Sequence, residues 1–211
     1  MLTPRLSFPV AVLLAIVGCR EATAPLGERI AADRQLKLAM PAGLNILQQS
    51  PTAPRLKAYR VSFWAKRGSQ RTVGVSYRPA PGQSQGDPFL RFKIPMNGLV
   101  AGADGIPLDR GDSVLITLTI DSVSFLVDFQ PSGVLFSKSS PAQLAIWYQD
   151  ANPDLNGDGV VDATDEALKQ QLAIWTESTK SAWKQLSSRN DTTQQYVAAE
   201  LYHFSSYALS W

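Results

Sequence analysis

Hydrophobic and polar residues alternate with a period of two along most of the chain from Tyr59 onward. In residues 114–120 the even positions are Val, Ile, Leu and Ile, and the odd positions between them are Leu, Thr and Thr. One face of this segment is therefore strongly apolar and the other is mixed, which is typical of a half-buried strand. The predicted strands are Tyr59–Lys66, Arg71–Tyr77, Phe89–Ile94, Val114–Ile120, Ser124–Phe129, Val134–Phe136, Gln143–Tyr148, Gln171–Thr176, Ala182–Leu186, Gln195–Tyr202 and Ser206–Leu209. Many short strands separated by Gly, Pro, Asp and Ser predict an all-β fold, a Greek-key-like β-sandwich.

One short motif recurs: Leu-Ala-Ile-Trp occupies residues 144–147 and again residues 172–175. We expect these to be two neighbouring strands, with the acidic segment between them inserted in the turn. Residues 165–170 have a helix-forming composition and an acidic start, which suits a helix N-terminus. Pro153, just before the acidic segment, argues against a helix entering it. The prediction is a strand, a loop and a short helix, with Trp147 and Trp175 in the core rather than on a sugar-binding surface.

The segment from Asp154 to Asp165 carries the strongest chemical signal in the chain. Side-chain oxygens stand at positions 1, 3, 5, 9 and 12 of a twelve-residue loop, with glycine at position 6. The residues concerned are Asp154, Asn156, Asp158, Asp162 and Asp165, and the glycine is Gly159. This is the ligand spacing of an EF-hand-type site, in which Ca²⁺ takes six to eight oxygens at about 2.3–2.6 Å. Carboxylates this close repel one another without a cation between them. The alternative is an acidic turn that holds no metal.

The first residues predict export. Arg5 is a positive start, and Phe8–Val17 is an apolar run too short to span a bilayer as a stable helix. Residues 16–19, Ile-Val-Gly-Cys, resemble the lipobox of bacterial lipoproteins. The resemblance implies a signal peptide over residues 1–18 and a lipid on Cys19. Arg20 follows it instead of Asp, so the inner-membrane retention signal is absent and the outer membrane is the expected destination. The alternative is an ordinary secretory signal.

Composition bounds the rest of the chain. Pro and Gly among small and polar residues predict a flexible tether over residues 19–55, followed by one domain over residues 56–211. Roughly 190 residues remain after the leader, enough for one sizeable sandwich. The formal net charge is +2, and Lys and Arg are scattered without a basic stripe, so no nucleic acid is expected as a partner. Cys19 is the only cysteine, which leaves no disulfide to build.

The acidic loop resembles one half of a dockerin, the duplicated calcium module of cellulosomal proteins, which favours Asp at position 12. The resemblance implies side-chain oxygens from Asp154, Asn156, Asp158 and Asp165, the backbone carbonyl of Val160, and Asp162 acting directly or through water. A dockerin has two such loops that pack together, and this chain has one. The resemblance therefore supports calcium binding more than docking to a cohesin partner.

A second resemblance covers roughly residues 89–209. Its motifs are residues 129–137 (FQPSGVLFS), 141–144 (PAQL), 183–186 (WKQL) and 197–208, with the ending LYHFSSYA as the most specific piece. They resemble the ZU-five type of β-sandwich domain, which is shared by zonula occludens, netrin-receptor and ankyrin proteins and also occurs in bacterial exported proteins. The resemblance implies a structural or interaction module.

His203 is the only histidine, and it begins a His-Phe-Ser tripeptide. In some relatives of the ZU-five type this tripeptide cleaves itself between Phe and Ser. In the corresponding reaction here, His203 would take the hydroxyl proton of Ser205, whose oxygen would attack the carbonyl carbon of Phe204. A strained peptide would also be required. The alternative is that the ending closes a sheet, with Phe204 in the core and His203 hydrogen-bonded.

These observations predict an exported, lipid-anchored, calcium-binding β-sandwich that acts as an interaction or scaffolding module of the cell envelope and is not an enzyme. Its expected partners are the membrane, through the lipid on Cys19, and an envelope protein or glycan. Two alternatives stay open: an autoproteolytic module using His203 and Ser205, and a dockerin-like module that docks a protein or glycan through the loop. Carboxylates outside the loop are too scattered for a glycosidase site.

Overall fold

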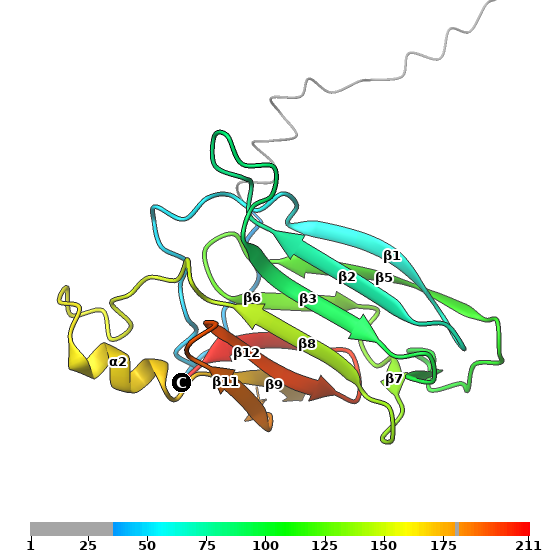
Figure 1. Ribbon diagram of the computed structural model, residues 1–211. Helices are drawn as coiled ribbons and strands as arrows, with labels where there is room; N and C mark the ends of the chain where they lie inside the picture. Colours follow the sequence, from blue (N-terminus) through cyan, green and yellow to red (C-terminus); the bar gives the residue numbers. More distant parts are fainter. Residues whose placement is uncertain (1–35, 180–181) are drawn as a thin grey trace, which may run out of the picture.

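Two antiparallel sheets facing each other form the body of the computed structural model, which describes residues 36–179 and 182–211 (Figure 1). The six-stranded sheet has the order β1 (Arg60–Lys66), β5 (Ser113–Ile120), β6 (Leu126–Gln130), β13 (Ser206–Ser210), β9 (Ala173–Thr179) and β10 (Ala182–Gln185). The five-stranded sheet has the order β11 (Ser188–Asp191), β12 (Tyr196–Leu201), β8 (Ala142–Trp147), β3 (Pro88–Ile94) and β2 (Arg71–Ser76). A short pair, β4 (Leu99–Ala101) and β7 (Leu135–Phe136), lies beside them. The all-β, sandwich-like fold predicted from the alternation is confirmed.

Helical structure among the described residues is confined to α2 (Ala163–Lys169), which follows the acidic loop as predicted. Within residues 36–179 and 182–211 there is no helix with the length and hydrophobicity that a bilayer crossing requires. The predicted signal peptide, Cys19 and the tether residues up to 35 lie outside the described part of the chain.

The core fills the space between the two sheets, and an aromatic cluster lies within it. On β2, Val73 and Val75 are buried while Thr72 and Gly74 are exposed, as the period of two requires. Phe129 of β6 stacks on Phe204 with ring centroids 4.8 Å apart, and Phe92 of β3 lies at the same distance from Phe129. Pairs of this kind add about 0.5–1.5 kcal/mol each beyond the burial of their area. These rings therefore link both sheets to the segment that contains Phe204.

The segment that precedes β1 is part of the fold, which differs from the prediction of a flexible tether as far as residue 55. Leu47 and Leu56 are each only 1% exposed, and the N–H of Leu47 donates to the carbonyl of Leu209 at 2.9 Å. Ile46 packs with Leu126 in a small separate cluster. The prolines and glycines of this segment suggested a linker. Its few large apolar side chains nevertheless have more to gain from burial than the chain loses in entropy.

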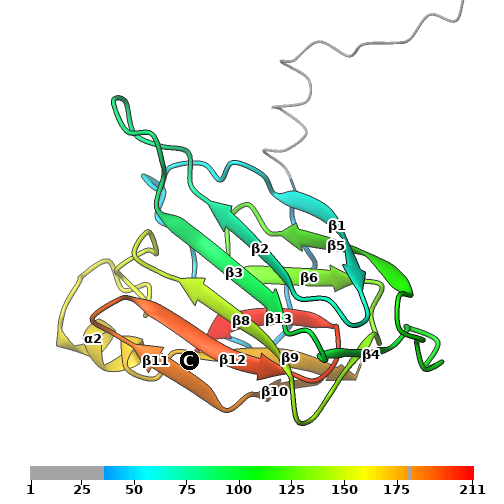
Figure 2. The ribbon, with the colours of Figure 1, turned by 45° about the vertical axis from the view of Figure 1, so that its right-hand side comes forward.

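The two Leu-Ala-Ile-Trp segments are not neighbouring strands, so that prediction was wrong. The first lies in β8, which pairs with β3 and β12 in the five-stranded sheet. The second lies at the start of β9, which pairs with β13 and β10 in the six-stranded sheet. The acidic loop and α2 therefore carry the chain from one sheet to the other (Figure 2). Trp147 and Trp175, predicted to be core residues, are half-buried.

A buried carboxyl oxygen stands just beyond β8. Oδ2 of Asp150 and the hydroxyl of Tyr77 are both buried and have no hydrogen-bond partner among the described residues. Burial, followed by the charge of Asp87, raises the pKa of Asp150 above its usual range. Burial, followed by the charge of Asp150, raises the pKa of Tyr77. The ionised Asp150 carboxylate therefore costs the folded protein stability at neutral pH.

We expect Asp150→Asn to raise the melting temperature at pH 7, because the amide has the same shape without the charge. The folded-state pKa of Asp150 is raised. The loss of stability caused by its ionised carboxylate is therefore fully present above that pKa, and it disappears as the pH falls toward the pKa of an aspartate in the unfolded chain. The gain from the substitution should therefore shrink on acidification, as measured by calorimetry from pH 7 to 4. Asp109→Asn, at an exposed position, is the matched control. A variant less stable than the parent at pH 7 would contradict this account.

Candidate functional site

The acidic loop and helix α2 occupy one end of the sandwich, where the chain leaves β8 and returns as β9 (Figure 1). The entry to the loop is held by Leu155, which is half-buried and packs against the core. The far side of the loop is open to solvent, since Val160 and Val161 are 59% and 62% exposed. The loop is therefore attached to the body at its ends and presents its middle to solvent.

The first half of the loop is a series of tight turns made by its own side-chain oxygens. Asp154 accepts from two glycine N–H groups: Gly157 donates to Oδ1 at 2.7 Å and Gly159 to Oδ2 at 2.9 Å. Oδ1 of Asn156 accepts from the N–H of Asp158 at 2.9 Å. Gly157 and Gly159 have φ of 76° and 87°, a left-handed conformation that residues with a Cβ rarely adopt. The sharp turn predicted at Gly159 is present.

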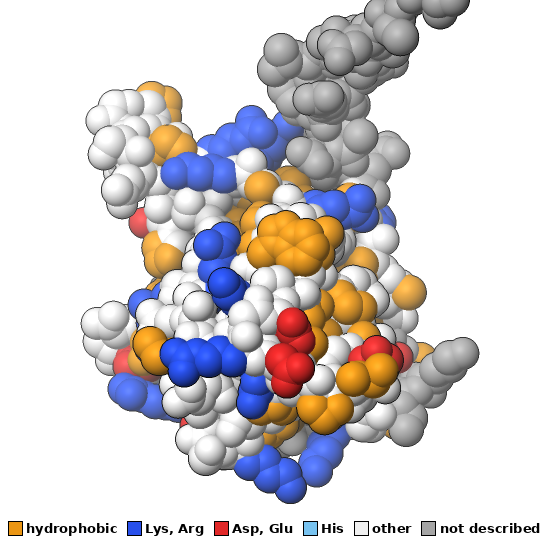
Figure 3. Space-filling model, turned by 90° about the vertical axis from the view of Figure 1, so that its right-hand side faces the viewer, with side chains coloured by type: hydrophobic (Ala, Val, Ile, Leu, Met, Phe, Trp, Pro, Cys, Tyr) orange, Lys and Arg blue, Asp and Glu red, His pale blue; other side chains and the backbone are white. Residues whose placement is uncertain are grey.

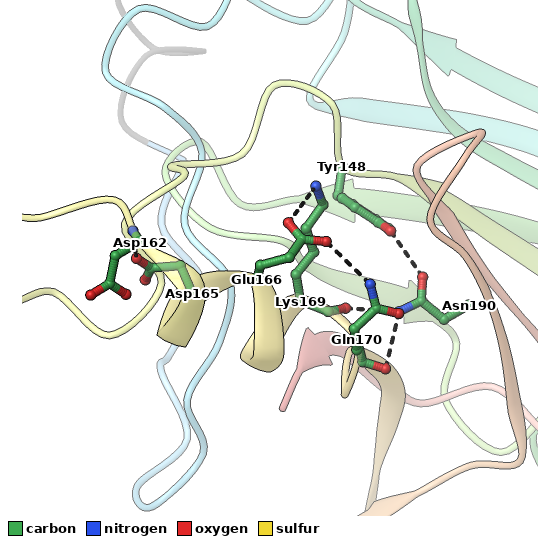
Figure 4. A network of polar contacts seen from close by, with 7 residues as sticks. All are labelled: Tyr148, Asp162, Asp165, Glu166, Lys169, Gln170 and Asn190. Atoms are coloured by element: carbon green, nitrogen blue, oxygen red, sulfur yellow. Dashed lines mark hydrogen bonds and ion pairs between the residues drawn. The ribbon is translucent and has the colours of Figure 1, made fainter.

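Asp165 closes the loop on itself. Its carboxylate is only 3% exposed and accepts three backbone N–H groups, from Leu155 at 2.7 Å, Asn156 at 3.2 Å and Asp162 at 2.9 Å. Asp162 is the N-cap of α2 and accepts from the N–H of Thr164 at 2.7 Å, so the two acids form a capping box (Figure 4). The N–H of Asp162, ahead of those of Asn156 and Leu155, lowers the pKa of Asp165. The beginning of the loop is thereby fixed to the helix that follows it.

The other end of α2 is fastened to the five-stranded sheet (Figure 4). Asn190 of β11 donates through Nδ2 to the carbonyl of Lys169 at 2.8 Å, which satisfies a carbonyl at the helix C-terminus. Tyr148, next to β8, donates through its hydroxyl to Oδ1 of Asn190 at 2.9 Å. Burial, followed by the charges of Glu166 and Asp191, raises the pKa of Tyr148 to about 12. Tyr148 therefore stays a hydrogen-bond donor over the physiological pH range.

The donors along the loop are all oxygens, which suits a hard cation such as Ca²⁺. Among the predicted ligands Asp154 is half-exposed, Asn156, Asp158, Val160 and Asp162 are exposed, and Asp165 is buried. Each carboxylate oxygen that accepts one N–H keeps a second lone pair for a cation. Asp165 fits least well, because its Oδ1 already accepts two N–H groups. Within the described residues, no three His, Cys, Asp or Glu side chains are grouped as they would be around a metal ion.

The His-Phe-Ser segment joins β12 to β13 and takes the arrangement of a sheet closure. Phe204 is 1% exposed within the aromatic cluster, and Nδ1 of His203 lies 3.3 Å from the carbonyl oxygen of Phe204. The hydroxyl of Ser205 donates to the carbonyl of Glu177 in β9 at 2.7 Å. Self-cleavage needs this hydroxyl next to the imidazole as a general base. The nucleophile and base predicted from sequence are thus near in the chain but hydrogen-bonded to different groups.

The tryptophans of the described residues do not form one platform. Trp64 of β1 is 62% exposed and lies opposite Leu115 of β5, on the outer face of the six-stranded sheet, whereas Trp147 belongs to the five-stranded sheet. On the face that Figure 3 shows, Lys and Arg side chains lie at separate positions among hydrophobic ones, with few acidic side chains. The visible charge therefore forms no continuous basic stripe on that face.

Comparisons with protein-family models, with curated proteins and with solved structures found no match to this chain. The resemblances to a dockerin half and to the ZU-five type of domain stay predictions. Sequence reasoning did not find Tyr148 and Asn190, because neither stands in a motif with the loop. Asn190 lies about two dozen residues beyond the loop and reaches α2 only through the fold.

We expect Asn190→Ala to lower the free energy of unfolding by about 1–3 kcal/mol, because the Lys169 carbonyl and the Tyr148 hydroxyl would both lose a partner. Urea unfolding monitored by tryptophan fluorescence gives the value. Tyr148→Phe should lower the free energy of unfolding by less, since Asn190 can still donate to the Lys169 carbonyl. Asn97→Ala, at an exposed position, serves as the control. Equal stability of Asn190→Ala and the control would show that this contact does not fasten the helix.

For the self-cleavage hypothesis, we expect the intact mass of the purified chain to include residues 205–211, with no species ending at Phe204. The reason is that the Ser205 hydroxyl is bonded to the Glu177 carbonyl and not to His203. Ser205→Ala should lower stability by about 1 kcal/mol through loss of that bond and leave the pattern of masses unchanged. A species ending at Phe204 that disappears in Ser205→Ala would establish the cleavage instead.

Proposed function

We propose that this chain is an exported, lipid-anchored β-sandwich that binds one Ca²⁺ ion in the Asp154–Asp165 loop and serves as an interaction or scaffolding module of the cell envelope. The observation that carries the calcium part is the conformation of the loop. Its oxygen donors follow the spacing of a calcium loop, and the turns at Gly157 and Gly159 fold the chain back so that the N–H groups of both glycines meet the Asp154 carboxylate.

The cation would act as a structural staple. Asp154, Asn156 and Asp158 would supply side-chain oxygens and Val160 its carbonyl, with Asp162 and Asp165 completing the set. The four carboxylates of this set, Asp154, Asp158, Asp162 and Asp165, stand within one short loop. A bound divalent cation would reduce the repulsion among them. At affinities of extracellular sites, on the order of 10⁻⁴–10⁻³ M, the loop would be filled outside a cell and would not act as a sensor.

An interaction role is supported by the way the two sheets are connected. The loop, helix α2 and Asn190 join one sheet to the other at one end of the body, so calcium would stiffen the scaffold that presents the sheet faces. The Ser205 hydroxyl and His203 are bonded elsewhere, which favours a module over a self-processing enzyme. The lipid on Cys19 would hold the module at a membrane, with an envelope protein or glycan as partner.

The proposal predicts that Ca²⁺ raises the melting temperature of the full chain in detergent. At a free Ca²⁺ concentration ten times Kd, the stabilisation is about 1.4 kcal/mol. Asp158→Asn should abolish this stabilisation, because it removes one of the proposed ligand carboxylates. Asp158 is exposed and bonded only within the loop, so the substitution leaves the core intact. Calorimetric titration of Ca²⁺ into both proteins measures the affinity directly.

Two controls make this test specific. Asp104→Asn changes the same charge in another exposed turn and should keep the response to calcium. Mg²⁺ at the same concentration should stabilise less, because it needs a stricter octahedron than this loop provides. The proposal fails if calcium has no effect on the parent chain, or if Asp158→Asn responds as the parent does.

A further inference from the structure

The outer face of the five-stranded sheet has a hollow floored by alanines. Strand register places Ala145 of β8 directly opposite Ala198 of β12, with Arg91 of β3 and Arg189 of β11 as the next residues outward in the same row. On an exposed sheet face these positions usually carry long polar or β-branched side chains, which cover the backbone and gain cross-strand contacts. Two adjacent alanines at the centre leave an open hollow of about 770 Å³.

The rows on either side of the alanines differ in chemistry. One row pairs Trp147 with Tyr196, whose ring centroids are 5.5 Å apart, and of the two Tyr196 lines the hollow. The other row places Lys93, Gln143 and Glu200 side by side across β3, β8 and β12. The paired rings thus stand on one side of the alanine floor, and the charged and amide groups stand on the other, where Tyr202 also lines the hollow.

Positive charge predominates among the residues that line the hollow. Its cations are Arg91, Lys93 and Arg189, and its single carboxylate, Glu200, accepts a hydrogen bond from the Tyr202 hydroxyl at 3.0 Å. The guanidinium carbon of Arg91 lies 5.4 Å from the centre of the Trp147 ring, which orients the arginine without neutralising it. Arg189, which makes a 3.3 Å ion pair with Asp191, is largely exposed and has further donors to offer.

From this arrangement we infer that the outer face of the five-stranded sheet binds an acidic polysaccharide, a chain of uronic-acid sugars. The alanine floor lets a flat sugar ring approach the sheet closely. Tyr196 and Tyr202 offer ring faces to the apolar side of a pyranose, and the side chains of Gln70 and Gln143 offer hydrogen bonds to hydroxyls. Arg91, Lys93 and Arg189 pair with the carboxylates.

This inference deepens the proposed function, on whose interaction role it rests, by naming the chemistry of the partner. The site lies on the sheet face and uses none of the loop ligands. Binding should therefore be the same in the parent chain and in Asp158→Asn, so failure of the calcium proposal and failure of the saccharide proposal give different results.

The test is binding of polygalacturonate to the full chain in detergent, measured by calorimetry with chelator present, since calcium gels this polymer. We expect saturable binding at moderate salt that Ala145→Gln weakens at least tenfold by filling the hollow. Arg91→Gln should weaken it severalfold through loss of a carboxylate partner. Arg60→Gln, on β1 of the other sheet, removes the same charge from an exposed position and should change nothing.

Three outcomes would overturn the inference. Absence of binding, or binding that Ala145→Gln leaves intact while thermal melting shows the variant folded, rules out the hollow as the site. Equal affinity for dextran, a neutral polymer of glucose, removes the role of the three cations. Equal affinity for polyglutamate shows that the face recognises acidic chains in general, which removes the selectivity for sugars.

Discussion

The passage of the chain between the two sheets, from Trp147 to Ala173, is the constraint on which the candidate site depends. The first residues of this crossing pair with the N-terminal segment, where the N–H of Asn152 donates to the carbonyl of Gln48 at 2.8 Å. The remainder has no strand beside it and must satisfy its backbone polar groups in another way. Asp165 meets much of that need from a single buried carboxylate, which binds N–H groups at both the beginning and the end of the loop. Asn190 and Tyr148 then hold the helix to the five-stranded sheet. A cation in the loop would stiffen a connection that is already closed.

The crossing also determines which surfaces are free. Because the acidic loop and α2 lie at one end of the sandwich, they leave the outer face of the five-stranded sheet uncovered (Figure 1). The opposite sheet differs, since Ile46 from the N-terminal segment packs on Leu126 and Ala208. The segment nearest the predicted lipid anchor therefore lies against one sheet, and the hollow with its cations opens on the other. This division fits the proposal of a membrane-tethered module with a free binding face.

How far sequence could lead is visible in particular residues. Alternation predicted the sandwich because burial on one face imposes a period of two, and loop spacing predicted the turns at Gly159 because only glycine tolerates that φ easily. The pairing of the two Leu-Ala-Ile-Trp segments was wrong, since similar strands need not be partners. β11 was missed because Ser-Arg-Asn-Asp has no apolar alternation, and Asn190 with it. The pairing of Ala145 with Ala198 could not be predicted, because it depends on the register between two separate strands.

The most direct test of the central claim, that the crossing is a calcium staple, is amide hydrogen exchange of the full chain in Ca²⁺ and in chelator. The amides of Asn156, Gly157 and Gly159 donate to loop carboxylates, so their exchange reports whether a cation holds those oxygens in place. The account predicts about tenfold slower exchange in this loop at ten times Kd, with strand β5 unchanged as reference. Identical exchange in the loop under both conditions would contradict it.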